Sequence, residues 1–156
     1  MSKLFNVVLV HPEIPQNTGN ISRTCAVTDT ALHIIRPIGF EISDRTLRRA
    51  GLDYWHLLDV TYYDSYEEFL QKHGDSPLFF FTAGAANRFD RVEYPAGSFL
   101  VFGKESSGLE PEILEGNAHR AVRIPMRGGV RCLNLSNAVA VALYRALDGQ
   151  GYPDFE

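Results

Sequence analysis

The chain has 156 residues, of which 45% are hydrophobic and 22% charged, and its formal net charge at pH 7 is −4. These values predict one globular domain over residues 1–156 and argue against a disordered chain or a general nucleic-acid coater. No apolar stretch approaches the roughly 20 residues of a membrane span, and no signal peptide is evident, so we expect a cytoplasmic protein without membrane contact. The two cysteines and five histidines have no metal-ligand spacing, and we expect no metal.

Predicted strands and helices alternate along the chain. In chain order they cover residues 4–10 (strand), 17–30 (helix), 32–37 (strand), 45–50 (helix), 60–64 (strand), 65–74 (helix), 78–82 (strand), 98–102 (strand), 110–116 (helix), 121–126 (strand) and 137–149 (helix). Asn17 or Thr18 is expected near the start of the first helix. Ser65 and Glu68 have the spacing of a capping box, and Pro111 suits a first helical turn.

The order of these elements predicts the fold class. Strands 78–82 and 98–102 are almost wholly apolar, as expected for strands that are buried on both faces of a sheet. Strands that alternate with helices indicate an α/β fold, with a mostly parallel sheet and helices on both of its faces.

Ligands of parallel α/β sheets gather beyond the carboxyl ends of the strands. The familiar signatures of such sites are missing from this sequence: it has no G-x-G-x-x-G or G-x-x-x-x-G-K-[ST] motif, and no G-x-S-x-G elbow. A dehydrogenase, a P-loop enzyme and an α/β-hydrolase are therefore disfavoured.

Three junctions nevertheless carry residues suited to chemistry. In "FGKESSGLEP", Gly103 permits close backbone approach to a ligand and Glu105 could orient a bound group. In "NTGNISR", Arg23 would lie in the second turn of a helix beginning near Thr18, with its side chain directed toward the helix N-terminus, where negative charge is favoured. Each junction taken alone is better explained as an ordinary loop or helix surface.

The third junction, "RIPMRGGVRCLNLSNAVAVALY", places two glycines and several arginines between a predicted strand and a predicted helix. It is either a surface loop or a loop that wraps around a ligand. Twelve of the fifteen basic residues are Arg, the better bidentate ligand for phosphate. Base composition and solvated surfaces would explain this bias equally well, although an acidic chain can still have a local basic groove.

Taken together, "NTGNISR", "LVFGKESSGL" and "IPMRGGVRCLNLSNAVAVALY" occur in the order and approximate spacing of the three motifs of the SPOUT superfamily of methyltransferases. With "HPEIPQNTGNISRTC", "HIIRPIGF" and "LRRAGLDY" added, nearly the whole chain resembles the YibK-like or TrmL family of tRNA (cytidine/uridine wobble-position) 2′-O-methyltransferases. Each motif alone is weak, but the ordered set is specific.

The resemblance implies several properties that composition and spacing do not show. It implies a deep C-terminal trefoil knot, S-adenosylmethionine as cofactor with S-adenosylhomocysteine as product, and a homodimer. The expected reaction is 2′-O-methylation of the wobble ribose (position 34, cytidine or modified uridine) of leucine tRNAs. Two alternatives remain: an enzyme that modifies another tRNA or rRNA position, and a non-catalytic module that binds S-adenosylmethionine or RNA.

The resemblance also implies roles for individual residues. Those expected around the cofactor are Phe81, Thr82, Gly103, Ile124, Met126, Cys132 and Leu133. Those expected to be catalytic or to shape the site are Arg23, Asn17, Glu105 and Asn134. Apart from the resemblance, arginines suit contacts with tRNA phosphates, and the candidates for that role are Arg48, Arg49, Arg127 and Arg131. At Cys132 the family usually has Ser, an exchange that a cofactor contact made by the backbone would tolerate.

Overall fold

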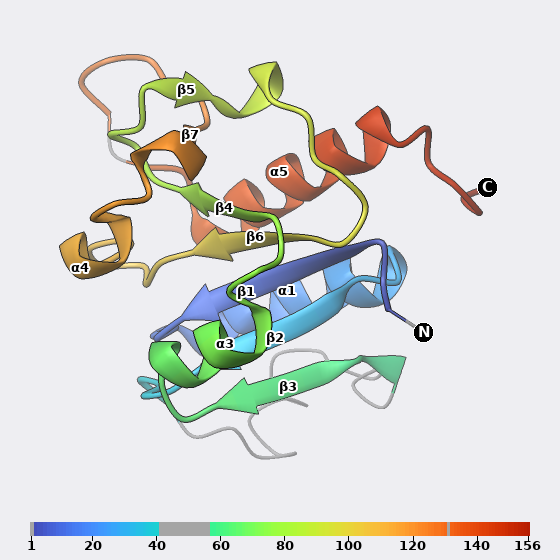
Figure 1. Cartoon of the computed structure of the whole chain (residues 1–156), viewed down its shortest axis with the longest axis horizontal. Coiled ribbons are helices and arrows are strands. Elements are labelled where there is room, and N and C mark those ends of the chain that lie inside the picture. Colours follow the sequence, from blue (N-terminus) through green and yellow to red (C-terminus); the bar gives the residue numbers. More distant parts are fainter. Residues whose placement is uncertain (1, 41–56, 131) are drawn as a thin grey trace.

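The structure is a computed structural model that describes residues 2–40, 57–130 and 132–156. The described residues form a parallel sheet of order β3-β2-β1-β6-β4-β7-β5 (Figure 1). Its strands, in chain order, are β1 (Phe5–Val10), β2 (Ala31–Ile35), β3 (Val60–Tyr63), β4 (Leu78–Phe81), β5 (Asn87–Arg88), β6 (Ser98–Phe102) and β7 (Ala121–Arg123). Every strand pair in it is parallel, which confirms the predicted fold class.

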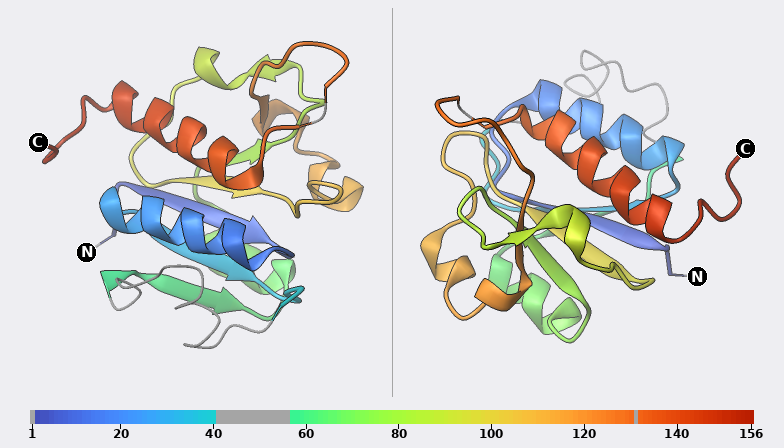
Figure 2. Two further views of the ribbon diagram at one scale, coloured as in Figure 1. Left: turned by 180° about the vertical axis from the view of Figure 1, so that it is seen from behind. Right: turned by 90° about the horizontal axis from the view of Figure 1, so that it is seen from above.

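Helices cover both faces of the sheet. α1 (Pro15–Val27) and α5 (Leu135–Gly149) lie side by side on one face, whereas α3 (Tyr66–His73) and the short α4 (Pro111–Leu114) lie on the other (Figure 2). Two 3-10 turns, η2 (Phe89–Arg91) and η3 (Ala118–Arg120), belong to the connections.

The alternation of side chains along β1 divides the core into two layers. Val7 and Leu9 belong to the cluster that packs under α1 and α5, while Val8 and Val10 belong to the cluster that packs under α3 and α4. All residues of β1, β2 and β6 are buried, because a strand between two helical layers has no face toward solvent. The apolar composition of 98–102 predicted this burial correctly.

The predicted start of the first helix is wrong by two or three residues. α1 begins at Pro15 with Ile14 as the N-cap residue, and the fixed φ of proline suits the first helical position. Arg23 therefore lies in the third turn rather than the second. The last helix also begins earlier than expected, at Leu135, because the Asn134 side chain caps it.

The capping box of α3 is confirmed in part. The Ser65 hydroxyl accepts the Glu68 amide at 3.1 Å, but the Glu68 carboxylate returns to the amide of Asp64 at 2.7 Å. Pro111 does begin α4. The strand expected over 121–126 ends at Arg123, and the two-residue strand β5 was not predicted. The helix predicted over 45–50 lies outside the described residues.

Candidate active site

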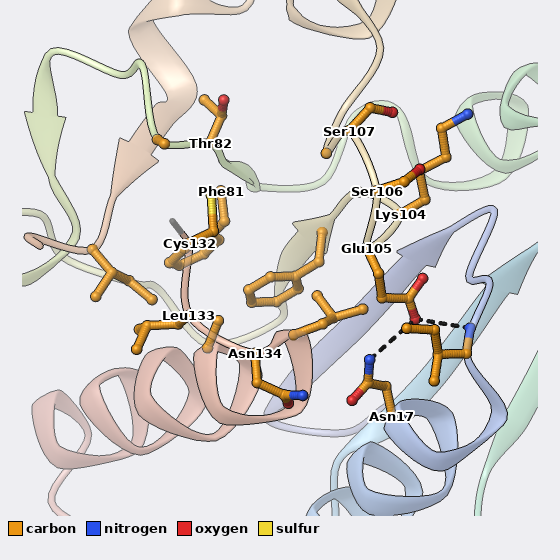
Figure 3. A pocket seen from close by; sticks show the side chains of 18 of the residues that line it. Asn17, Phe81, Thr82, Lys104, Glu105, Ser106, Ser107, Cys132, Leu133 and Asn134 are labelled. Atoms are coloured by element: carbon orange, nitrogen blue, oxygen red, sulfur yellow. Dashed lines mark hydrogen bonds between the residues drawn. The ribbon is translucent and has the colours of Figure 1, made fainter. Parts of the chain in front are cut away.

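A cavity of about 450 Å³ opens at the carboxyl ends of β4, β6 and β7 (Figure 3). Its walls also include residues from the N-terminal ends of α1 and α5, so it collects segments that are far apart in the sequence. This location agrees with the expectation that ligands of parallel sheets gather beyond the strand ends. The volume lies in the usual range for small-molecule and cofactor sites.

Two aromatic rings from neighbouring strands form an apolar part of the wall. Phe81 ends β4 and Phe102 ends β6, and the two residues are opposite each other in the parallel register. Their rings stack with centroids 4.7 Å apart and an interplanar angle of 16°. Ile124, Met126 and Leu133 add further apolar surface to the cavity, which therefore suits a flat, apolar group.

The loop after β6 curls back on itself beside the cavity. The Gly108 amide donates to the Lys104 carbonyl at 2.8 Å, and Gly108 has a φ of +72°. A Cβ on Gly103 would lie well inside van der Waals contact with the backbone of Gly108 and Leu109. Gly103 is thus required by the close approach of two backbone segments, which lets the loop form a tight turn beside the cavity.

Glu105 connects this loop to the N-terminus of α1. Its carboxylate accepts hydrogen bonds from the backbone amides of Glu13 at 2.7 Å and Ile14 at 3.2 Å. It also accepts from the Asn17 side chain at 3.5 Å (Figure 3). The amides before the first turn of a helix need acceptors, and negative charge is favoured there. The Glu105 carboxylate, from a separate part of the chain, supplies both the acceptors and the negative charge.

Glu13 makes the complementary contact. Its carboxylate accepts from the Ser106 amide at 2.9 Å and from the Ser106 hydroxyl at 2.7 Å. These hydrogen bonds stabilise the ionised form and hold the pKa of Glu13 below its usual range. Glu13 and Glu105 therefore each bind the segment that carries the other, beside the N-terminus of α1.

Asn134 precedes α5 and serves as its N-cap. Its Oδ1 atom accepts from the backbone amides of Ser136 at 2.9 Å and Asn137 at 3.4 Å, and from the Ser136 hydroxyl. The side chain also borders the cavity. The N-terminus of α5, with its partial positive charge, is thereby fixed next to any ligand in the cavity.

The structure brings ten of the predicted cofactor and catalytic residues together around this one cavity. They are Asn17, Phe81, Thr82, Gly103, Glu105, Ile124, Met126, Cys132, Leu133 and Asn134. Arg23 is exposed on α1 and does not line the cavity. Arg127 is exposed on the loop that follows β7. Arg48, Arg49 and Arg131 lie outside the described residues.

Sequence reasoning missed several cavity residues. No role was predicted for Ser106 and Ser107, yet both line the cavity, as does Ile14. Their position between Gly103 and Gly108 was the available signal, since a turn closed by two glycines exposes the residues between them. Ile14 gave no local signal, because its place at the cavity depends on where α1 begins.

Within residues 2–40, 57–130 and 132–156, His, Cys, Asp and Glu side chains form no group of three that could hold a metal ion. Over the same ranges, no helix has the length and apolar character needed to cross a membrane.

Several known proteins are similar to this chain over nearly its whole length. A tRNA (cytidine(34)-2′-O)-methyltransferase of Escherichia coli is 46% identical over 151 residues, which cover 96% of each chain. A crystal structure from Bacillus anthracis has a TM-score of 0.92 and 46% identity, covering 97% of this chain and 98% of that one. A structure solved in work on the 2-OH methylation of C/U34 on tRNA has a TM-score of 0.87 and 41% identity, with coverages of 95% and 97%. Residues 4–144 match the model of the SpoU rRNA Methylase family. The chain therefore belongs to the SpoU rRNA Methylase family.

Proposed function

We propose that this protein is an S-adenosylmethionine-dependent methyltransferase that 2′-O-methylates the ribose of nucleotide 34 of tRNA. The observation that carries the proposal is the cavity at the ends of β4, β6 and β7, which gathers the residues expected around the cofactor. Relatives that are about as long as this chain and 46% identical to it carry the same activity in their names.

The residues of the cavity fit S-adenosylmethionine. The stacked pair Phe81 and Phe102 and the side chains of Ile124 and Leu133 offer apolar surface to an adenine ring. Gly103 borders the cavity without a side chain, so polar ligand groups would meet backbone donors and acceptors there. The residues that would hold the cofactor are Phe81, Thr82, Gly103, Ile124, Met126, Cys132 and Leu133.

When bound, S-adenosylmethionine supplies an electrophilic methyl group that needs no metal. The protein must hold the ribose 2′-oxygen in line with that group and lower the free energy needed to remove its proton. The Glu105 carboxylate holds the N-terminus of α1 and the Asn17 amide in place. Arg23, on the same helix, would stabilise negative charge on the 2′-oxygen as the proton leaves. Arg side chains remain protonated at neutral pH and are therefore poor bases, so Arg23 is assigned charge stabilisation rather than proton removal.

For the acceptor we propose the wobble nucleotide of leucine tRNAs, with cytidine or modified uridine at position 34. A nucleotide in the anticodon loop can be splayed out, and its phosphates can be bound by arginines. Arg127 is exposed on the loop that also carries the cavity residues Ile124 and Met126. Arg48, Arg49 and Arg131 are assigned to tRNA only because arginines suit contacts with phosphates. A tRNA substrate would place the enzyme in the cytoplasm.

We further propose that the enzyme acts as a homodimer in which the paired helices α1 and α5 form the interface. Their surface carries apolar side chains that are partly exposed: Val27 is 66% exposed, Val141 44% and Tyr144 39%. Exposed apolar side chains on adjacent helices are typical of a protein interface. Arg23 is exposed on α1 as well, so a partner packed on these helices would bring it close to the interface.

The decisive experiment measures transfer of a labelled methyl group from S-adenosylmethionine to tRNA from cells that lack this protein, followed by nuclease mapping. We expect label on the ribose of nucleotide 34 of leucine tRNA. Label at another RNA position would leave the reaction intact and replace the acceptor. Tight S-adenosylhomocysteine binding without any label would favour a non-catalytic binding module. Sedimentation analysis of the protein and of a Val141→Arg variant tests the dimer, which the variant should dissociate.

A further inference from the structure

Two carboxylates connect the 103–108 loop to the start of α1, and only one of them lies at the cavity. Glu105 borders the cavity, whereas Glu13 does not. The Glu13 carboxylate nevertheless binds the cavity-lining Ser106 through both its amide, at 2.9 Å, and its hydroxyl, at 2.7 Å. Glu13 thus acts on the cavity wall from outside.

The two contacts are reciprocal. Glu105 accepts the backbone amide of Glu13, and Glu13 accepts the backbone amide of Ser106, the residue next to Glu105. Each segment therefore supplies a carboxylate to the other's main chain across more than 90 residues of sequence. We call this arrangement of Glu13, Glu105 and Ser106 the carboxylate clasp.

The clasp acts on the exposed middle of the loop, whereas the buried Leu109 and the contact of Glu110 with His11 at 3.2 Å hold its C-terminal end. Ser106 and Ser107 are exposed, so burial does not fix them. The loop closes on itself through the Gly108 amide and the Lys104 carbonyl, but that turn does not determine how it sits against α1. The hydrogen bonds of Glu13 and Glu105 hold this middle part against α1, because they join Ser106 and Glu105 to residues immediately before the helix.

We propose that Glu13 and Ser106 are positioning residues, which hold the 103–108 loop against the N-terminus of α1 in the shape that receives the cofactor. This inference rests on the proposed function, since it concerns the same cavity. Glu13 does not touch the ligand and acts through Ser106. Its loss should weaken cofactor binding without changing how tRNA is bound.

The test measures binding of S-adenosylhomocysteine by calorimetry to the wild-type chain and to Glu13→Ala, Ser106→Ala, Glu13→Gln and the double alanine variant. Glu13→Ala removes both hydrogen bonds to Ser106 and should raise Kd about fivefold to tenfold. Ser106→Ala keeps the amide contact and should have a smaller effect. The double variant should bind no more weakly than Glu13→Ala, because the Ser106 hydroxyl is hydrogen-bonded to Glu13.

Glu13→Gln distinguishes a positioning role from a charge effect. The amide oxygen of Gln can still accept both hydrogen bonds from Ser106, so Kd should return to within about twofold of wild type. Gln16→Ala is the matched control, an exposed change on the same helix, and should leave Kd unchanged. The KM for tRNA and the melting temperature should stay close to wild type in all variants, since the clasp is at the surface.

Two results would overturn the inference while the proposed function stands: a wild-type Kd in Glu13→Ala, or additive effects of the two alanine changes. A melting temperature that falls in parallel with the affinity would also overturn it, because that pattern indicates general destabilisation. A wild-type protein that fails to bind S-adenosylhomocysteine would instead refute the proposed function itself.

Discussion

The Oδ1 atom of Asn134 accepts the backbone amide of Ser136 at 2.9 Å and caps α5 at the edge of the cavity. This contact occupies the oxygen of the side-chain amide, so any contact that Asn134 makes to a substrate falls to its Nδ2 group. Two functions of one side chain, capping and substrate contact, can therefore be separated by substitution.

Asn134→Asp should preserve the cap, because a carboxylate oxygen accepts the same amides, and stability should stay within about 0.5 kcal/mol of wild type. Turnover should fall about tenfold through loss of the Nδ2 donors. Asn134→Ala should lose both the helix cap and the Nδ2 donors, with a destabilisation of about 1 kcal/mol. Chemical denaturation and methyl-transfer assays measure the two effects. Wild-type turnover in Asn134→Asp would show that the residue serves the site only through the helix.

Gly103→Ala should prevent the 103–108 loop from closing. The added Cβ would collide with the backbone of Gly108 and Leu109, and backbone cannot move aside as a side chain can. We expect destabilisation of about 3 kcal/mol and no measurable binding of S-adenosylhomocysteine.

The matched control is Gly84→Ala, a glycine in the turn that follows Thr82 and Ala83 at the cavity. A Cβ there meets nothing within 4 Å, so both stability and binding should stay near wild type. Equal losses in the two variants would mean that close backbone approach is not what Gly103 provides.

The sequence predicted the elements whose signals are local. The run at 98–102 is apolar throughout, and it is buried on both faces as β6. The start of α1 has one local signal, Pro15 at the first helical position. Its other support is distant, because Glu105 binds the amides of Glu13 and Ile14 just before the helix. The two-residue strand β5 is likewise set by its pairing with β7, which leaves no pattern within Asn87 and Arg88.

The candidate site likewise contains residues that local patterns predicted and residues that they did not. Two glycines after an apolar strand predicted a ligand-binding loop at 103–108 from local pattern alone. Position 103 does require a residue without a side chain. The meeting of Phe81, Met126 and Leu133 at one cavity came from the family resemblance, since no local pattern relates three separate segments. The contact of Ser106 with Glu13 could not be predicted, because the two residues are 93 positions apart.

Arg23→Ala should separate catalysis from cofactor binding. Arg23 is exposed on α1 and does not border the cavity, so Kd for S-adenosylhomocysteine should remain within about twofold of wild type. Turnover should fall roughly a hundredfold or more if its charge stabilises the 2′-oxygen in the transition state. Arg91→Ala, which removes another exposed arginine, provides the control. Near-normal turnover in Arg23→Ala would refute the assignment.

A buried hydrogen-bonded chain lies on the other side of the sheet from α1. His33 contacts the Tyr63 hydroxyl at 2.7 Å and the Asn6 side-chain oxygen at 2.9 Å, and the Tyr63 hydroxyl contacts His73 at 3.1 Å. Burial, with a smaller contribution from the charge of His73, lowers the pKa of His33 from 6.5 to about 4. Burial also raises the pKa of Tyr63 to about 12. These hydrogen bonds are therefore stable with His33 neutral.

This lowered pKa makes the stability of the fold depend on pH. Above pH 6.5 His33 is neutral in both the folded and the unfolded chain, and stability is complete. Between pH 6.5 and about 4 the unfolded chain binds a proton that the folded chain does not, so up to about 3 kcal/mol is lost as pH falls. Chemical denaturation across this range should show a shallower pH dependence for His33→Asn than for wild type, although His33→Asn is less stable at pH 7. His119→Asn, a change at an exposed histidine, should keep the wild-type slope, and equal slopes in all three proteins would exclude His33 as the source.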